Sequence, residues 1–160
     1  MISDGTIALR ILIAAGLGMA IGIERELRDQ WAGLRTHILV SVGSCLFTLM
    51  SAIGFRAFAA GGAKPDATVD VTRIAAQVVV GIGFIGGGTI LRQGANVRGL
   101  TTAATLWVTA AIGLSVAAGA YLAAVVTTAV AVVTLSGLKP LEKWIAKIGK
   151  AGSRDEESGG

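Results

Sequence analysis

The first long apolar run of the sequence ends in residues that could bind a cation. Glu24 follows this run directly, with Arg25 and Glu26 next to it. A carboxylate in an apolar environment must be paired, either with an arginine or with a cation. A charged helix end that only fixes the depth of the helix is the alternative. We therefore predict Glu24 as the candidate metal ligand and Arg25 as part of the same motif. The arginines expected to pair with Glu24 are Arg35, Arg92 and Arg98.

Hydroxyl groups recur near the starts of two predicted helices. Thr36 follows Arg35 in one segment, and Thr101 and Thr102 follow Arg98 in another. Threonine caps a helix by accepting a hydrogen bond from an exposed backbone N–H group. Capping therefore explains much of both segments, and a functional motif is the alternative.

Two more polar segments complete the candidate site. Residues 94–96, which end in Asn96, are polar and turn-prone, and we expect them to line a cytoplasmic vestibule. Asp70 and Arg73 lie three residues apart, a spacing that suits a local ion pair. Gln77 lies one turn further into an apolar run, where an amide needs a partner. We predict that Gln77 joins helices, with pore lining as the alternative.

Several kinds of chemistry are not expected. His37 cannot build a zinc site alone, because zinc needs at least three protein ligands, and an interfacial histidine is its expected state. Cys45, the one cysteine, excludes a disulfide framework. Residues 81–86 match the letters of a dinucleotide fingerprint, but they lie in a long apolar run without a preceding strand. No catalytic set appears, so we expect no enzyme and no cofactor.

Composition places these residues in a membrane protein. The chain of 160 residues is 53% hydrophobic and 15% charged, with a mean hydropathy of +0.72. A hydrocarbon core of about 30 Å requires about 20 helical residues. The sequence therefore predicts an all-α bundle of about five transmembrane helices. The predicted spans are Thr6 to Ile23, Thr36 to Phe55, Val71 to Leu91, Leu100 to Ala118 and Ala120 to Leu138.

The basic residues predict the orientation. Of the 14 lysines and arginines, ten fall on one side of a five-span chain and four on the other. Since cytoplasmic loops are enriched in Lys and Arg, the N-terminus is expected outside and the C-terminus in the cytoplasm. The positive net charge thus reflects topology and not nucleic-acid binding. We predict a transmembrane domain over residues 1–139, an amphipathic cytoplasmic helix over 140–152 and a disordered tail over 153–160.

Glycines predict close contacts between helices. Gly18 with Gly22, and Gly83 with Gly87, have the small-xxx-small spacing at which membrane helices pack tightly. The glycines also recur between residues 16–37 and 81–102, which suggests a parallel repeat of two helix pairs plus a fifth helix.

Longer motifs resemble the MgtC/SapB family of bacterial inner-membrane proteins. The resemblance runs from about Gly16 to Gly113. The motifs are Gly18-x-x-x-Gly22-x-Glu24-Arg25, Gly33-Leu34-Arg35-Thr36-His37, Arg73-Ile74-Ala75-Ala76-Gln77, the glycine-rich run 81–88, and Val97-Arg98-Gly99-Leu100-Thr101-Thr102 with Trp107.

The resemblance implies about five helices and a role in growth when magnesium is scarce, and in some pathogens survival inside macrophages. It also implies a membrane partner such as the F-type ATP synthase. Virulence-type members carry Asn where this chain has Thr101 and Cys where it has Val108, and these departures weaken the case for that partner. We expect the family's frequent C-terminal soluble domain to be absent, because about twenty residues follow Pro140.

The sequence is compatible with two functions. A regulator would act through helix contacts with another inner-membrane complex, and a small oligomer, in particular a dimer, would suit it. A small transporter or channel for magnesium or another cation would need polar residues that converge inside the bundle. Here the polar residues lie mostly at helix ends, which favours the regulator.

Overall fold

The computed structural model describes residues 2–60 and 73–138. This part of the chain contains five helices and one short hairpin, so the predicted all-α fold is confirmed. The helices are α1 (Asp4–Glu26), α2 (Leu34–Ala60), α3 (Arg73–Gly88), α4 (Leu100–Ala117) and α5 (Tyr121–Gly137). The hairpin strands are β1 (Leu91–Gln93) and β2 (Asn96–Arg98). The predicted helix 140–152, the predicted tail 153–160, and Asp70 lie outside the described residues.

Three helices are long and apolar enough to cross a membrane. They are Asp4–Glu26, the Leu34–Ile53 part of α2, and Leu100–Ala117. In their described parts, α3 and α5 are shorter apolar helices of 16 and 17 residues. The described part of the chain therefore contains three helices that could cross a membrane by length and composition, and two shorter apolar ones.

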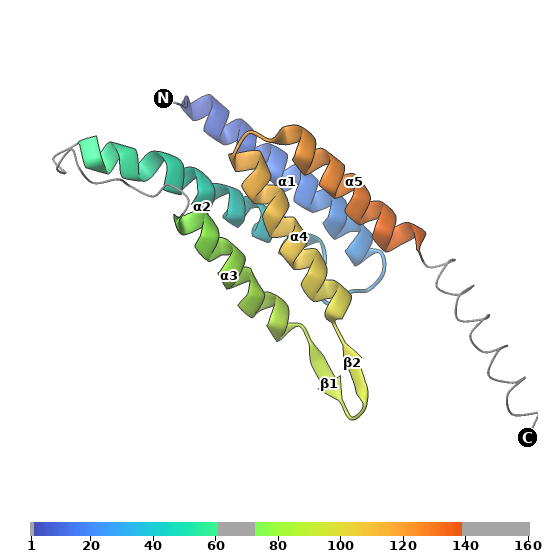
Figure 1. The fold of residues 1–160 in the computed structure, drawn as a ribbon. Coiled ribbons are helices and arrows are strands. Elements are labelled where there is room, and N and C mark those ends of the chain that lie inside the picture. Colours follow the sequence, from blue (N-terminus) through green and yellow to red (C-terminus); the bar gives the residue numbers. More distant parts are fainter. Residues whose placement is uncertain (1, 61–72, 139–160) are drawn as a thin grey trace, which may run out of the picture.

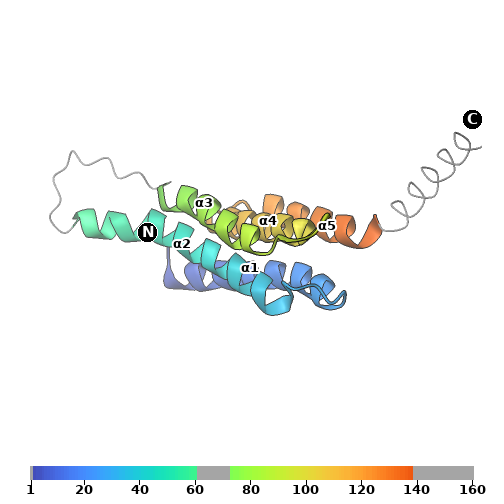
Figure 2. The same cartoon turned by 90° about the horizontal axis from the view of Figure 1, so that it is seen from below.

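The helices form two layers, and α4 lies in the middle of one of them. Figure 2 shows α3, α4 and α5 in one layer, lying over α1 and α2. α4 packs against each of the other four helices. Its side chains Ile112 and Val116 are fully buried in one cluster with Ile21 of α1 and Leu49 of α2. The central position of α4 means that its ends can connect residues from several helices.

Glycines permit the closest helix contacts. A Cβ added at Gly18 would lie 2.7 Å from the backbone oxygen of His37, and one at Gly22 would lie 2.8 Å from the Cα of Leu34. A Cβ added at Gly113 of α4 would collide with the backbone oxygen of Ser41. Only hydrogen fits at these points, so α1 and α4 both approach the backbone of α2 closely.

The predicted contact at Gly83 and Gly87 is not found within the described chain. A Cβ at either residue would meet no heavy atom within 4 Å. The glycine of α3 that faces α4 is Gly86, where a Cβ would lie 3.5 Å from the backbone oxygen of Ala103. Ile82 and Gly86, four residues apart, form the buried side of α3, which leaves Gly83 and Gly87 exposed.

A specific turn separates α4 from α5. Gly119 has a φ of 82°, a conformation that glycine adopts without strain. Arg10 of α1 donates a hydrogen bond of 2.6 Å to the backbone oxygen of Ala117 and one of 3.1 Å to the Tyr121 hydroxyl. The chain therefore turns at residues 118–120, where the sequence offered only small residues, and forms two helices in place of one long one.

A β-hairpin replaces the loop expected between α3 and α4. Leu91 pairs with Arg98 and Gln93 with Asn96 in an antiparallel register. All six strand residues are exposed, and Gly94 at the turn has a φ of 62°. Figure 1 shows the hairpin projecting beyond the ends of α3 and α4. Residues 94–96 therefore stand away from the bundle and do not line a vestibule inside it.

The two helix pairs of the predicted repeat differ in detail. α1–α2 and α3–α4 alternate in direction in the same way (Figure 1), but a short loop joins the first pair and the hairpin joins the second. The packing glycines also fall at different positions of the proposed alignment, because Gly22 faces α2 whereas Gly86, and not Gly87, faces α4. The repeat stays a prediction.

Candidate functional site

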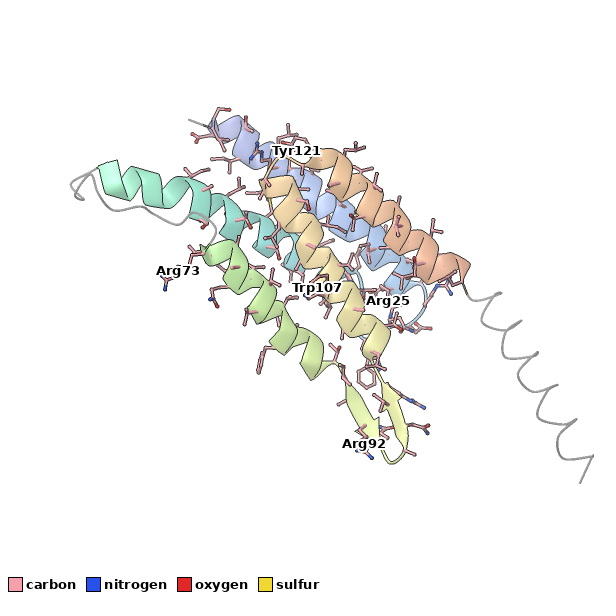
Figure 3. All side chains as sticks on the ribbon, in the orientation of Figure 1. Arg25, Arg73, Arg92, Trp107 and Tyr121 are labelled. Atoms are coloured by element: carbon pink, nitrogen blue, oxygen red, sulfur yellow. The ribbon has the colours of Figure 1, made fainter. Side chains whose placement is uncertain are left out.

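Five helix ends and the hairpin gather at one end of the bundle. These are the C-terminal ends of α1, α3 and α5, the starts of α2 and α4, and the β1–β2 hairpin (Figure 1). We call this the basic end, because its helix ends, loop and strands carry Arg25, Arg28, Arg35, Arg92 and Arg98. Figure 3 shows Arg25 and Arg92 near the hairpin end of the molecule and Arg73 at the opposite end of α3.

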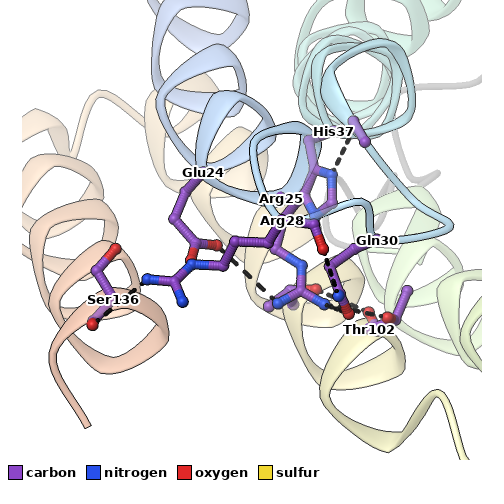
Figure 4. A network of polar contacts seen from close by, with 9 residues as sticks. Glu24, Arg25, Arg28, Gln30, His37, Thr102 and Ser136 are labelled. Carbon is purple, nitrogen blue, oxygen red and sulfur yellow. Dashed lines mark hydrogen bonds and ion pairs between the residues drawn. The ribbon is translucent and has the colours of Figure 1, made fainter. Parts of the chain in front are cut away.

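Glu24 is buried at the basic end, with 7% of its surface exposed. Its carboxylate forms an ion pair with Nε of Arg28, and Nη1 of Arg25 lies 4.0 Å from it. Nη2 of Arg28 also donates a hydrogen bond of 3.4 Å to the backbone oxygen of Ser136, near the end of α5 (Figure 4). Glu24 therefore holds the arginine that connects α1 to α5, and the predicted partners Arg35, Arg92 and Arg98 do not fill this role.

Arg25 connects α1 to α4. This residue is 4% exposed, and its Nη2 donates hydrogen bonds to Oε1 of Gln30 at 2.7 Å and to Oγ1 of Thr102 at 3.2 Å. Gln30 in turn donates from Nε2 to the backbone oxygen of Arg28 at 2.9 Å. The Thr102 hydroxyl thus accepts a hydrogen bond from a buried arginine. The N-cap residue of α4 is Gly99, and no side chain caps this helix start in the described chain. The expected capping role of Thr101 and Thr102 is wrong.

Glu26 caps α2 from the preceding helix. Its Oε2 accepts a hydrogen bond of 2.9 Å from the backbone N–H of Leu34, the first residue of α2. A Cβ at Gly33 would collide with this carboxylate. Among the described residues Thr36 has no capping bond, so the α1–α2 turn depends on the pair of Glu26 and Gly33 instead.

His37 is fully buried between α1 and α2, and its expected position at the membrane interface stays a prediction. Its Nδ1 lies 2.9 Å from the backbone oxygen of Gly33, and its Nε2 has no hydrogen-bond partner in residues 2–60 and 73–138. The close approach of α2 to Gly18 and Gly22 encloses this histidine. Within the same residues no group of three or more His, Cys, Asp or Glu side chains could hold a metal ion. In the described chain Glu24 therefore does not belong to a set of three such ligands that could hold a cation.

The structure brings together only part of the predicted motif. Glu24, Arg25 and Thr102 form one polar cluster. The remaining predicted residues lie apart from it: Arg35 and Thr36 on an open polar pocket of about 440 Å³, Asn96 and Arg98 on the hairpin, Thr101 on an exposed side of α4, and Arg73 and Gln77 on α3.

The cluster also contains three residues that were not predicted as its members, Arg28, Gln30 and Ser136. Arg28 follows Glu24 by four residues, the spacing at which a helix brings opposite charges together, so this pair carried a signal. Ser136 contributes a backbone oxygen, which has no residue-specific signal.

Buried hydroxyl groups inside the bundle bond to backbone oxygens. Thr109 donates to the oxygen of Thr105 and Thr128 to that of Ala124, both at 2.8 Å, and Ser41 donates to the oxygen of Ala14 at 2.7 Å. The helices and their polar contacts define an α-helical membrane protein in which buried polar groups join helices or bond to backbone.

Comparison with known proteins identifies the family. The MgtC family model matches residues 11–144, and the chain belongs to this family. It is 49% identical over 113 residues to the Escherichia coli K12 protein named "Putative magnesium transporter YhiD", and 45% identical over 125 residues to "Protein MgtC" of Brucella abortus strain 2308. These matches cover 71% and 78% of this chain, and 51% and 48% of the relatives. The chain therefore spans about half the length of the curated relatives it matches. No solved structure matches it.

Proposed function

We propose that this protein serves bacterial adaptation to low magnesium by regulating another inner-membrane complex through helix contacts. The observation that carries the proposal is the arrangement of the buried charges. Glu24 and Arg25 are buried at the end of α1. Arg25 donates a hydrogen bond to α4, and Glu24 forms an ion pair with Arg28, which in turn donates a hydrogen bond to α5. Because these charged groups bond to neighbouring residues, they stabilise the bundle. They are therefore not available to line a continuous polar route for an ion, for which they would be the most suitable residues.

The family supports the link to magnesium. Relatives carry the names MgtC and magnesium transporter, and the matched region includes the residues of the polar cluster. We infer that the protein lies in the bacterial inner membrane with the basic end in the cytoplasm, because the arginines of this end fit the enrichment of Lys and Arg in cytoplasmic loops. The N-terminus would then lie outside.

A transporter for magnesium or another cation is the alternative function. The name of the E. coli relative favours it. In that case Glu24 would exchange its arginine partner for a cation during transport. The two functions make opposite predictions for Glu24 and Arg28, because a structural ion pair needs both residues equally whereas a cation ligand needs only the carboxylate.

Flux into liposomes tests the choice. The purified chain is reconstituted with fluorescent reporters for magnesium and for protons, and wild type is compared with Glu24→Gln, Arg28→Gln and the double variant. The regulatory proposal predicts no flux above empty liposomes, together with a similar loss of thermal stability in both single variants and little further loss in the double variant. Magnesium flux that Glu24→Gln abolishes and Arg28→Gln preserves would establish the transporter instead.

Growth provides the functional measurement. A strain that lacks its own copy is complemented in low-magnesium medium by wild type or by variants that fold with normal stability in detergent. ATP-driven proton pumping in inverted vesicles, with and without the protein, tests the ATP synthase as the regulated complex. Unchanged pumping would remove that partner and leave other inner-membrane complexes to be tested.

A further inference from the structure

An open apolar groove of about 620 Å³ lies between α2 and α3. α3 lies at one edge of its layer, and α5 lies at the other (Figures 1 and 2). On α2 the groove extends from Leu39 to Phe47, which is the middle of the candidate span Leu34–Ile53. If α2 crosses the membrane over this span, the groove opens toward the hydrocarbon.

Gln77 brings an amide group into this apolar groove. It lines the groove from α3, is exposed, and forms no side-chain hydrogen bond with any residue that the structure describes. An amide has two donor hydrogens and an acceptor oxygen, and the hydrocarbon region of a bilayer contains no water to satisfy them. A hydrogen-bonding group from another helix would satisfy Gln77, whereas a lipid chain would not.

The same surface has both a hollow and a projecting side chain. A Cβ at Gly43 of α2 or at Gly81 of α3 would meet no heavy atom within 4 Å, so both walls of the groove have room for a neighbour. Phe84, one turn from Gly81, lines the groove and is 87% exposed. A surface with a hollow and a matching projection can pack against a copy of itself.

We propose that a second copy of this chain occupies the groove and forms a symmetric dimer through α3. Two copies inserted in the same direction are related by a twofold axis along the membrane normal, so the two Gln77 amides lie at the same depth. Because an amide both donates and accepts, the pair can satisfy each other. Phe84 of each copy enters the hollow of the other, and Gly81 allows the two α3 helices to approach closely.

The charge of Arg73 sets the direction in which the helices diverge. Arg73 precedes Gln77 by four residues, is exposed, and would lie near its own copy in a dimer. Repulsion between the two arginines separates the helices on that side, which leaves the level of Gly81 as the point of closest approach. This interface does not depend on the proposed regulatory function and would serve a transporter equally.

Cysteine cross-linking in membranes tests the interface. Cys45 is replaced by alanine, and Gly81→Cys is compared with Leu122→Cys, whose side chain is 78% exposed on α5 at the other edge. Copper phenanthroline with oxygen oxidises two thiols to a disulfide. The proposal predicts cross-linked dimers for Gly81→Cys and few for Leu122→Cys at low protein-to-lipid ratio. Equal cross-linking at both sites would overturn it.

Association measured by energy transfer between labelled copies tests the amide. Gln77→Leu should weaken dimerisation by about threefold to thirtyfold, the range that interhelical hydrogen bonds give in membranes, while Gln77→Asn should retain most of the association. Because Gln77 is exposed, both variants should keep normal helix content, which circular dichroism checks. A monomeric wild type, or equal association of wild type and Gln77→Leu, would show that lipid or another protein occupies the groove and would refute the dimer.

Discussion

The contact at Gly18 allows a sharp test of how α1 and α2 pack. Gly18→Ala places a methyl group 2.7 Å from the backbone oxygen of His37 and 2.9 Å from the Cβ of Ser41. One of these atoms is backbone, so the helices must separate. Overpacking of this kind costs about 1–3 kcal/mol. Alanine is also a better helix former than glycine by about 0.5–1 kcal/mol, which offsets part of the cost.

Gly16→Ala is the matched control. Gly16 lies two residues earlier in the same helix, and a Cβ there meets no heavy atom within 4 Å. Both variants gain the same helix propensity, so the difference between them isolates the packing cost of about 1–3 kcal/mol. At about 2–4 °C per kcal/mol, Gly18→Ala should unfold about 2–12 °C below Gly16→Ala.

Thermal unfolding in detergent, followed by circular dichroism, measures this difference. Equal midpoints, or a more stable Gly18→Ala protein, would refute the close contact between α1 and α2.

Three further predictions concern the polar contacts, all measured by unfolding in detergent. Thr102→Val removes an acceptor of Arg25 and should cost about 1–3 kcal/mol, and an unchanged midpoint would show that this bond is not needed. Arg10→Ala removes the hydrogen bonds to Ala117 and Tyr121 and should destabilise the α4–α5 turn by about 1–3 kcal/mol. Tyr121→Phe removes only the second bond and should cost less; a larger loss for Tyr121→Phe than for Arg10→Ala would contradict this role of Arg10. Glu26→Ala removes the cap of α2 and should cost about 0.5–2 kcal/mol, whereas Glu26→Gln, which keeps an acceptor, should cost less.

The apolar pattern of the sequence was sufficient to predict the helices. Runs of about 20 apolar residues give a strong signal, and α4 (Leu100–Ala117) ends within one residue of the predicted span. The boundary between α4 and α5 followed from small residues alone. The hairpin was missed because each strand has three residues, too few for an alternating pattern, and only Gly94 marked a turn.

The partners of the site residues could not be predicted in the same way. Glu24 was expected to pair with arginines of other segments, because depth in the membrane can be estimated from sequence while the direction in which a side chain points cannot. Glycine spacing has the same limit. Gly83 and Gly87 fit a packing motif, yet the buried side of α3 is set by its neighbours and contains Gly86.

The exposed hairpin also offers a practical handle on the protein. Its turn at Gly94 and Ala95 projects beyond the helices, and its strand residues are exposed. Short insertions at such tips are tolerated far better than insertions into packed helices. An epitope or a protease site placed there would mark one face of the bilayer, so that antibody access in intact and in opened cells would report which way the chain was inserted.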